Sequence, residues 1–139
     1  YSINALSKSM GTANYIVSLS ESFLTPMLLP AIIFVISAIM AFATGSSWGT
    51  FAICMPIALP LAFAFTDGQL GTLVYACFGA VAGGGVFGDH CSPLSDTTVL
   101  SSTGSAADHI DHVQTQLPYA LCCGALAVVL YLLIGFFAL

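Results

Sequence analysis

The sequence predicts an all-α polytopic membrane protein, and three observations lead to this prediction. Only 5% of the 139 residues are charged, against about 25% in a typical soluble domain. Hydrophobic residues make up 58% of the chain and the mean hydropathy is +1.02, so polar side chains are too few to cover a surface in water. Several uncharged stretches reach about 20 residues, the length of helix that crosses the hydrocarbon core. We expect a single transmembrane domain over residues 1–139, with about three or four spanning elements.

The composition also excludes some partners and cofactors. Lys and Arg together number 1 in this chain, and nucleic-acid binding needs several such residues to neutralise phosphates, so we exclude nucleic acid. No CxxC spacing links the cysteines, and we expect small buried hydrophobic side chains rather than a zinc site or disulfides. No cofactor is expected. The cysteines are Cys54, Cys77, Cys91, Cys122 and Cys123.

The first half of the chain contains one polar interruption within a long apolar stretch. Residues 1–22 are mixed in character and are predicted to be a helix end or an interfacial segment. Residues 23–65 carry no charge, but the string TGSSWGT at 44–50 cuts them with two glycines and four hydroxyls. Because both flanks are apolar, we expect the backbone freed by this cut to lie at membrane depth and to be satisfied within protein.

Two interpretations of residues 44–50 remain open. Gly45 and Gly49 can break the helix, so the segment is either a broken helix or the tip of a re-entrant hairpin that offers oxygen ligands. The alternative is a tight turn outside the membrane or a seam of small residues between helices. The candidate ligands are the hydroxyls of Thr44, Ser46, Ser47 and Thr50.

The segment at 70–104 is predicted to be a helix with an unwound polar part at 83–104. Residues 70–87 are uncharged, and glycines cluster at 83–85. Glycines allow either a close approach of two helices or local unwinding. Residues 88–104 follow with two Asp, one His and seven hydroxyls. The candidate positions for this break in the backbone are Gly85, Gly88 and Pro93.

Asp89 and Asp96 are the candidate ion-binding carboxylates. Desolvation between apolar segments disfavours a charged carboxylate, so a proton and a hard cation compete for it. Na⁺ prefers oxygen ligands, and nearby hydroxyls offer them. The spacing of seven residues between Asp89 and Asp96 would place both acids on one helical face, but Pro93 makes a continuous helix doubtful. The alternative is that both acids cap helices in a wet loop. The neighbouring hydroxyls belong to Ser92, Ser95, Thr97 and Thr98.

The remaining polar residues carry weaker signals. His90 next to Cys91 does not predict a zinc site, because adjacent side chains point apart and no second ligand pair lies nearby. Residues 105–116 are predicted to be an interfacial connection, although their Asp and His residues would also suit a metal ion or a pH sensor. Residues 117–139 are predicted to be a final spanning helix with Pro118 in its first turn. The Asp and His residues of the connection are Asp108, His109, Asp111 and His112.

Three strings resemble a known transporter family. ATGSSWGT at 43–50, FGDHCSPLSDTTVLSSTG at 87–104 and DHIDHVQTQLPYAL at 108–121 closely resemble the C-terminal portion of sodium/proton antiporters of the NhaC type, in the ion transporter superfamily. The resemblance implies a multi-pass protein of the inner cell membrane with two inverted repeats, of which this chain would hold mainly the second. It also implies that residues 44–50 are the tip of a re-entrant hairpin and that residues 83–98 are the unwound part of a broken helix facing it.

The resemblance implies exchange of Na⁺ for H⁺, with Asp89 and Asp96 as the Na⁺ and proton sites. Ser46, Ser47, Thr97 and Thr98 would add ligands, and His90 would tune the proton affinity of its neighbour. The expected partners are the bilayer, Na⁺, H⁺ and the remaining half of a longer transporter, and a homodimer is a further candidate assembly. The alternative is a Na⁺- or H⁺-coupled carrier of carboxylates such as malate and lactate, or of amino acids, on the same scaffold.

Enzyme activity is not expected. Residues 45–49 (GSSWG) match the GxSxG pattern with Ser47 as nucleophile, but that motif works on a strand-to-helix turn rather than within an apolar helical run. An intramembrane aspartyl protease would need a GxGD motif, and residues 86–89 read Val-Phe-Gly-Asp.

Overall fold

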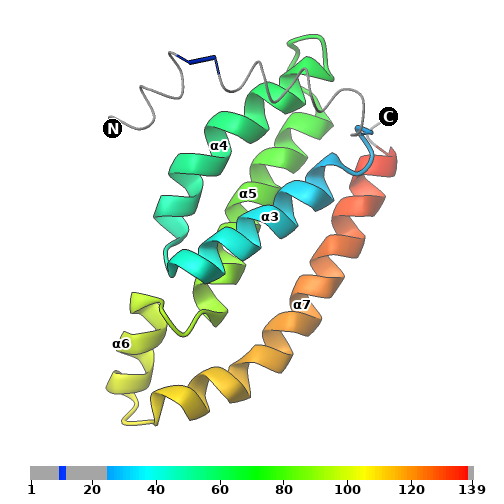
Figure 1. Ribbon diagram of the computed structural model, residues 1–139. Coiled ribbons are helices and arrows are strands. Elements are labelled where there is room, and N and C mark those ends of the chain that lie inside the picture. Colours follow the sequence, from blue (N-terminus) through cyan, green and yellow to red (C-terminus); the bar gives the residue numbers. More distant parts are fainter. Residues whose placement is uncertain (1–9, 12–24, 138–139) are drawn as a thin grey trace.

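The computed structural model describes residues 10–11 and 25–137, and within these ranges every regular element is a helix. The prediction of an all-α chain is therefore confirmed for this part. Apart from a turn at 10–11, the segment at 1–22 lies outside the described residues. The helices in Figure 1 are α3 (Leu29–Thr44), α4 (Ser47–Ala64), α5 (Thr72–Cys91), α6 (Asp96–Gly104) and α7 (His109–Phe137).

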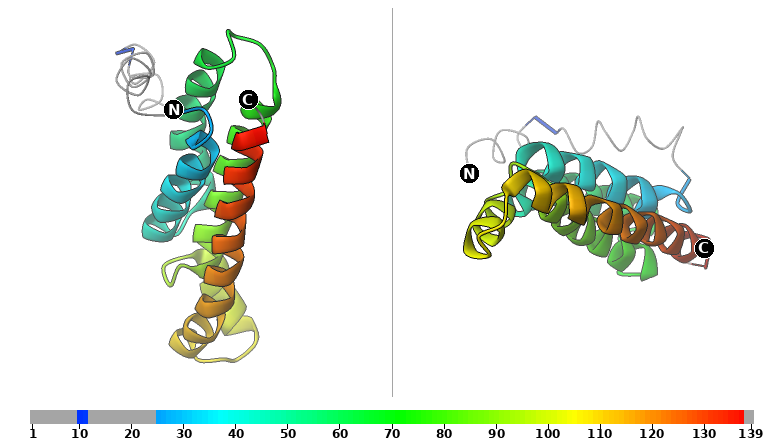
Figure 2. Two further views of the ribbon diagram at one scale, coloured as in Figure 1. Left: turned by 90° about the vertical axis from the view of Figure 1, so that its right-hand side faces the viewer. Right: turned by 90° about the horizontal axis from the view of Figure 1, so that it is seen from below.

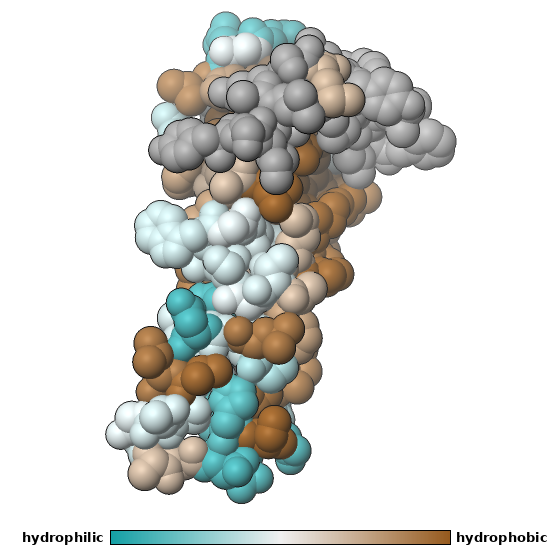
Figure 3. Space-filling model, turned by 60° about the vertical axis from the view of Figure 1, so that its left-hand side comes forward, coloured by the Kyte–Doolittle hydropathy of each residue, from teal (hydrophilic) through white to brown (hydrophobic). Residues whose placement is uncertain are grey.

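Three of the described helices, α4, α5 and α7, are long and apolar enough to cross a membrane. Helix α3 is also apolar but has only 16 residues. Large apolar side chains are exposed along α7, where only Ala120, Gly124 and Gly135 are buried. Figure 3 shows brown apolar surface along one side of the molecule and more polar residues toward its lower end. Apolar surface of this extent fits contact with lipid or with further transmembrane helices rather than with water.

Helix α5 is the centre of the arrangement, because it contacts α3, α4, α6 and α7. Helices α3 and α4 form an antiparallel pair, called the hairpin below, and Gly45 and Ser46 make its turn. Figures 1 and 2 show an elongated molecule with α7 running along its length. The last turns of α7 return to the start of α3, where Gly135 packs against the backbone of Met27.

Glycines in α5 serve close helix packing, which corrects the prediction of an unwound segment from residue 83. Helix α5 stays helical through Cys91. A Cβ at Gly84 would lie 2.4 Å from the carbonyl oxygen of Phe34 on α3, and one at Gly88 would lie 2.1 Å from that of Ala38. Gly85 packs in the same way against the ring of Phe51 on α4. Because these glycines have no side chain, α3 and α4 can approach α5 closely. Helix α5 does not unwind at Gly85 or Gly88.

The C-terminal part also differs from prediction. Residues 109–116 belong to α7, so the interfacial connection shrinks to the short link at 105–108. Pro118 consequently lies inside the helix instead of in its first turn. A proline inside a helix removes one backbone hydrogen bond and bends the helix, and Figure 1 shows α7 changing direction between its gold and orange parts.

Candidate functional site

The hairpin turn lies against a short non-helical segment between α5 and α6. This segment, called the break below, consists of residues 92–95. Gly45 in the turn has φ +65°, and a Cβ there would lie 2.7 Å from the carbonyl carbon and oxygen of Leu94. The left-handed backbone and the close contact both require glycine at this position. The two polar interruptions singled out in the sequence are therefore in contact.

A hydrogen bond fastens the break to the end of α3. The hydroxyl of Ser92, which is fully buried, donates to the carbonyl oxygen of Phe42 at 2.7 Å. Phe42 lies in the last turn of α3, where carbonyls have no partner within the helix. The same hydroxyl oxygen accepts a bond from the backbone N–H of Leu94 at 3.1 Å. Ser92 thus satisfies a carbonyl of α3 and stabilises the break at once.

Asp89, in the last turn of α5, is the only charged side chain buried in the described part of the chain. Its Oδ1 accepts a hydrogen bond from the hydroxyl of Ser95 at 2.8 Å. The Ser95 Oγ lies 2.7 Å from Thr97 Oγ1. Ser95 is fully buried, whereas Thr97 is exposed. The three side chains form a hydrogen-bonded chain from a buried carboxylate to the surface, called the hydroxyl chain below.

The described residues provide Asp89 with no cationic partner. The chain has a single Lys or Arg, Lys8, and that residue lies outside the described ranges. No group of three His, Cys, Asp or Glu comes together within those ranges. The site built by this part of the chain is therefore one buried carboxylate that is hydrogen-bonded to a buried hydroxyl, and oxygen donors of these kinds suit a hard cation.

Asp96 stands apart from the hydroxyl chain. It is the first residue of α6 and is exposed, and its Oδ1 accepts a bond from the N–H of Thr97 at 2.8 Å. An acid at this position stabilises the start of a helix. The non-helical break, which includes Pro93, lies between Asp89 and Asp96, so the two acids do not share one helical face. Asp96 is thus in the first turn of α6, directly after Ser95 at the N-cap position.

The hydroxyls of the hairpin turn make local bonds. Ser46 caps α4 by accepting from the N–H of Gly49 at 3.2 Å. Thr50, which is buried, donates back to the Ser46 carbonyl at 3.0 Å. Ser47 is the first residue of α4 and is partly exposed. These groups lie at the turn or in the first residues of α4, and their hydrogen bonds organise the start of α4 rather than the surroundings of Asp89.

Carbonyls at the end of α5 are satisfied by side chains from α6 and α7. Thr98, which is buried, donates to the carbonyl of His90 at 3.1 Å, and Gln116 Nε2 donates to the same oxygen. His109 Nε2 lies 2.8 Å from the carbonyl oxygen of Pro93. No role for Gln116 was predicted from the sequence, and the role of His109 remained open. Their spacing of seven residues on one helix was the available signal.

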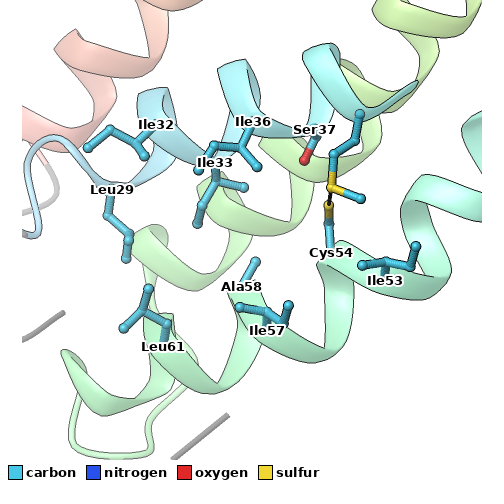
Figure 4. A pocket seen from close by; sticks show the side chains of 11 residues that line it. Leu29, Ile32, Ile33, Ile36, Ser37, Ile53, Cys54, Ile57, Ala58 and Leu61 are labelled. Carbon is cyan, nitrogen blue, oxygen red and sulfur yellow. Dashed lines mark hydrogen bonds between the residues drawn. The ribbon is translucent and has the colours of Figure 1, made fainter. Parts of the chain in front are cut away.

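A separate groove lies between α3 and α4, with a volume of about 200 Å³. Figure 4 shows its apolar walls, in which Cys54 Sγ contacts Met40 Sδ at 3.6 Å. Ser37 lines the groove, and its buried hydroxyl has no hydrogen-bond partner within the described residues. With one hydroxyl and no carboxylate, this groove lacks the oxygen ligands that a cation needs.

Comparison with known proteins shows the family to which the chain belongs. Residues 1–136 match the model of a family described as the Na⁺/H⁺ antiporter family. An uncharacterized Na⁺/H⁺ antiporter of Haemophilus influenzae is 30% identical over 127 residues, which cover 91% of this chain and 26% of that protein. No solved structure matches this chain.

Two further relatives are named for other substrates. The malate-2H⁺/Na⁺-lactate antiporter of Bacillus subtilis is 36% identical over 114 residues, covering 82% of this chain and 23% of that protein. The arginine/ornithine antiporter ArcD of Halobacterium salinarum is 34% identical over 128 residues, covering 92% of this chain and 25% of that protein. The chain therefore spans about a quarter of the length of the curated relatives it matches.

Proposed function

Because the chain belongs to the Na⁺/H⁺ antiporter family, we propose that it forms part of a secondary transporter that exchanges Na⁺ for H⁺ across the cell membrane. The remaining three quarters of such a protein would complete the transport path. In this proposal Asp89 is the carboxylate that binds Na⁺ and H⁺ in turn.

The observation that supports this role is the burial of Asp89, for which the described residues provide no cationic partner. A buried carboxylate is costly when charged and unpaired. It becomes favourable either by taking up a proton or by binding a cation. Both forms are neutral overall, and they exclude each other because they use the same oxygens. Competition of this kind at one site is sufficient for exchange.

The Na⁺ ligands would come from the hydroxyl chain and from carbonyls of the break. Ser95 donates its only proton to Asp89 and therefore accepts from Thr97, so one lone pair of the Ser95 oxygen remains available to a cation. Thr97 is exposed and would connect the site to water, which provides a route for protons and for Na⁺. Ser46, Ser47, Thr50, Ser92 and Thr98 lie in the turn or around the break and would support this site rather than bind the ion directly. Exchange through one carboxylate moves one Na⁺ for one H⁺ and is electroneutral.

We further propose that the hairpin is re-entrant. Helix α3 begins and α4 ends at the same end of the molecule (Figure 1). The hairpin turn lies partway along the length of the molecule, and α6 lies beyond this turn. The 16 residues of α3 span about 24 Å at 1.5 Å per residue, which is less than the ~30 Å hydrocarbon core. A turn and a break that meet inside the membrane resemble the discontinuous helices of transporters built from inverted repeats. The missing half would supply the opposite repeat.

The names of the relatives favour a second candidate, an antiporter of carboxylates or amino acids. Since no Arg exists in this chain, an anionic substrate would depend on the N–H groups at the starts of α4 and α6. These helix starts lie in the turn and next to the break, and would bind a carboxylate beside the cation.

Inverted membrane vesicles containing the full-length transporter test the proposal. Addition of Na⁺ to vesicles with an imposed pH gradient should dissipate that gradient. Asp89→Asn keeps the shape of the side chain and its acceptor oxygen for Ser95 but cannot bind or release the proton, so it should abolish the response. Asp96→Asn is the matched control and should retain the response.

Each other outcome has a defined meaning. If Asp89→Asn were as active as the wild type, the proposed site would be wrong. Loss in both variants would support the paired carboxylates predicted from the sequence, and a net charge moved per cycle would then respond to voltage by about 2.3 kcal/mol per 100 mV. A response that required malate, lactate, arginine or ornithine would favour the second candidate.

A further inference from the structure

Two polar side chains of α7 contact the broken region of the chain, and the proposed exchange reaction leaves both of them without a role. His109 and Gln116 are seven residues apart and therefore lie on one face of the helix. His109 reaches the carbonyl of Pro93 in the break, and Gln116 reaches the carbonyl of His90 in the last turn of α5.

Both carbonyls lie where a helix supplies no partner. The His90 carbonyl is among the last four of α5, which have no partner within the helix, and Pro93 lies in the non-helical break. At membrane depth water cannot replace the missing partners. Thr98 shares the carbonyl of His90. The Pro93 carbonyl has His109 as its side-chain partner in the described part of the chain. The two α7 side chains thus supply donors on both sides of Ser92.

The hydrogen-bond geometry fixes one proton of His109. A carbonyl only accepts, so Nε2 must carry a proton to donate to Pro93 at 2.8 Å. Nδ1 lies 3.1 Å from Ser102 Oγ, which also lies 2.9 Å from the Val99 carbonyl. The Ser102 hydroxyl can donate either to Nδ1 or to the Val99 carbonyl, and the bond from Nε2 to the Pro93 carbonyl is the same in both arrangements.

We propose that His109 and Gln116 are positioning residues of the cation site. They hold the break in the shape that places the hydroxyl of Ser95 on Asp89. This inference rests on the proposed function, because His109 and Gln116 can affect the affinity for Na⁺ only if the site binds Na⁺. Loss of either donor should loosen the break and weaken Na⁺ binding, while the maximal rate of exchange stays nearly unchanged.

The first test measures Na⁺-evoked dissipation of the pH gradient by the full-length transporter as a function of Na⁺ concentration. His109→Leu and Gln116→Leu should raise the half-saturating Na⁺ concentration about three- to tenfold, the range that one lost hydrogen bond produces. His109→Gln places an N–H close to the position of Nε2 and should stay within about twofold of wild type. His109→Asn reaches toward Ser102 but not Pro93 and should resemble His109→Leu.

Matched controls come from the same helix. His112→Leu and Gln114→Leu remove the same side-chain types from positions whose side chains make no hydrogen bond to the residues that the structure describes, and both should behave like the wild type. Equal loss of affinity in His109→Gln and His109→Leu, or equal loss in the controls, would overturn the proposal.

A second measurement does not depend on transport. Cys91 is the last residue of α5 and is only 3% exposed. In a full-length variant that keeps Cys91 as its single cysteine, the rate of alkylation by N-ethylmaleimide reports opening of the break. His109→Asn and Gln116→Leu should increase this rate severalfold, and His109→Gln should not. An unchanged rate in both variants would overturn the positioning role even if Na⁺/H⁺ exchange were observed. An increased rate in a protein without Na⁺/H⁺ exchange would refute the proposed function instead.

Discussion

Substitution of Gly88 by Ala tests how closely α5 must approach α3. The new Cβ would lie 2.1 Å from the carbonyl oxygen of Ala38, 2.7 Å from the N of Phe42 and 2.8 Å from the Cβ of Ala41. An ordinary van der Waals contact begins at 3.4 Å, so the two helices would have to separate locally by about 1.3 Å. The nearest atoms belong to backbone, which cannot turn aside as a flexible side chain can.

The separation of α3 from α5 would affect the candidate site by breaking one hydrogen bond. The hydroxyl of Ser92 donates to the Phe42 carbonyl at 2.7 Å. A displacement of about 1.3 Å along this bond would exceed the distance at which a hydrogen bond exists. Overpacking of a close interface costs about 1–3 kcal/mol. We therefore expect Gly88→Ala to reduce the stability of the protein and to release the break from the end of α3.

Thermal unfolding of the full-length transporter in detergent measures this effect, and Gly104→Ala is the matched control. A Cβ at Gly104, the last residue of α6, meets nothing within 4 Å among the described residues. This control should be neutral or slightly stabilising, because alanine favours a helix over glycine by about 0.5–1 kcal/mol. Equal unfolding temperatures for the two variants, with equal rates of exchange, would refute the close packing described for α3 and α5.

Three further substitutions test the contacts around the break. Gly45→Ala adds a Cβ at a left-handed φ of +65° against the backbone of the break, so it should lower the unfolding temperature and the exchange rate together. Ser92→Ala leaves the Phe42 carbonyl without its donor, and we expect a loss of about 1–3 kcal/mol in thermal unfolding; a stability equal to wild type would show that water replaces the hydroxyl. Ser95→Ala removes the bond to Asp89 and should raise the half-saturating Na⁺ concentration at least threefold, and an unchanged concentration would exclude Ser95 from the site.

The sequence predicted the helices well where apolar runs end at clear interruptions. Helix α3 ends at Thr44 and α4 begins at Ser47, within the polar interruption at 44–50. Asp89 could likewise be singled out from the sequence, because an acid that follows a long uncharged run is conspicuous, and in the structure its side chain is buried.

The glycine cluster could not be interpreted from the sequence alone. Unwinding and close approach both require glycine, and only the position of the partner helix distinguishes them. Gly84 and Gly88 face backbone atoms of α3, which the sequence does not reveal. The predicted length of the break depended on this choice, so residues 83–91 were wrongly expected to be unwound. Residues 96–104 of the same predicted segment are also helical and form α6.

The start of α7 was missed for a related reason. Residues 109–116 are polar and therefore resemble a connection in water. In the structure His109 and Gln116 use that polarity to bind carbonyls of the break and of α5. The role of a polar residue on a membrane helix becomes clear only when its hydrogen-bond partner is known. The partner of His109 lies 16 residues earlier in the chain, and that of Gln116 lies 26 residues earlier.

The most direct test of the proposed exchange is the number of protons released when Na⁺ binds. The full-length transporter in detergent is placed in weakly buffered solution with a pH indicator at a series of starting pH values. Na⁺ should release protons, and the number should rise toward one for each Na⁺ bound as the starting pH falls, because a protonated ligand must lose its proton. Asp89→Asn should release none, and Asp96→Asn should release as many as the wild type. Unchanged proton release in Asp89→Asn would contradict the assignment of the exchange to this carboxylate.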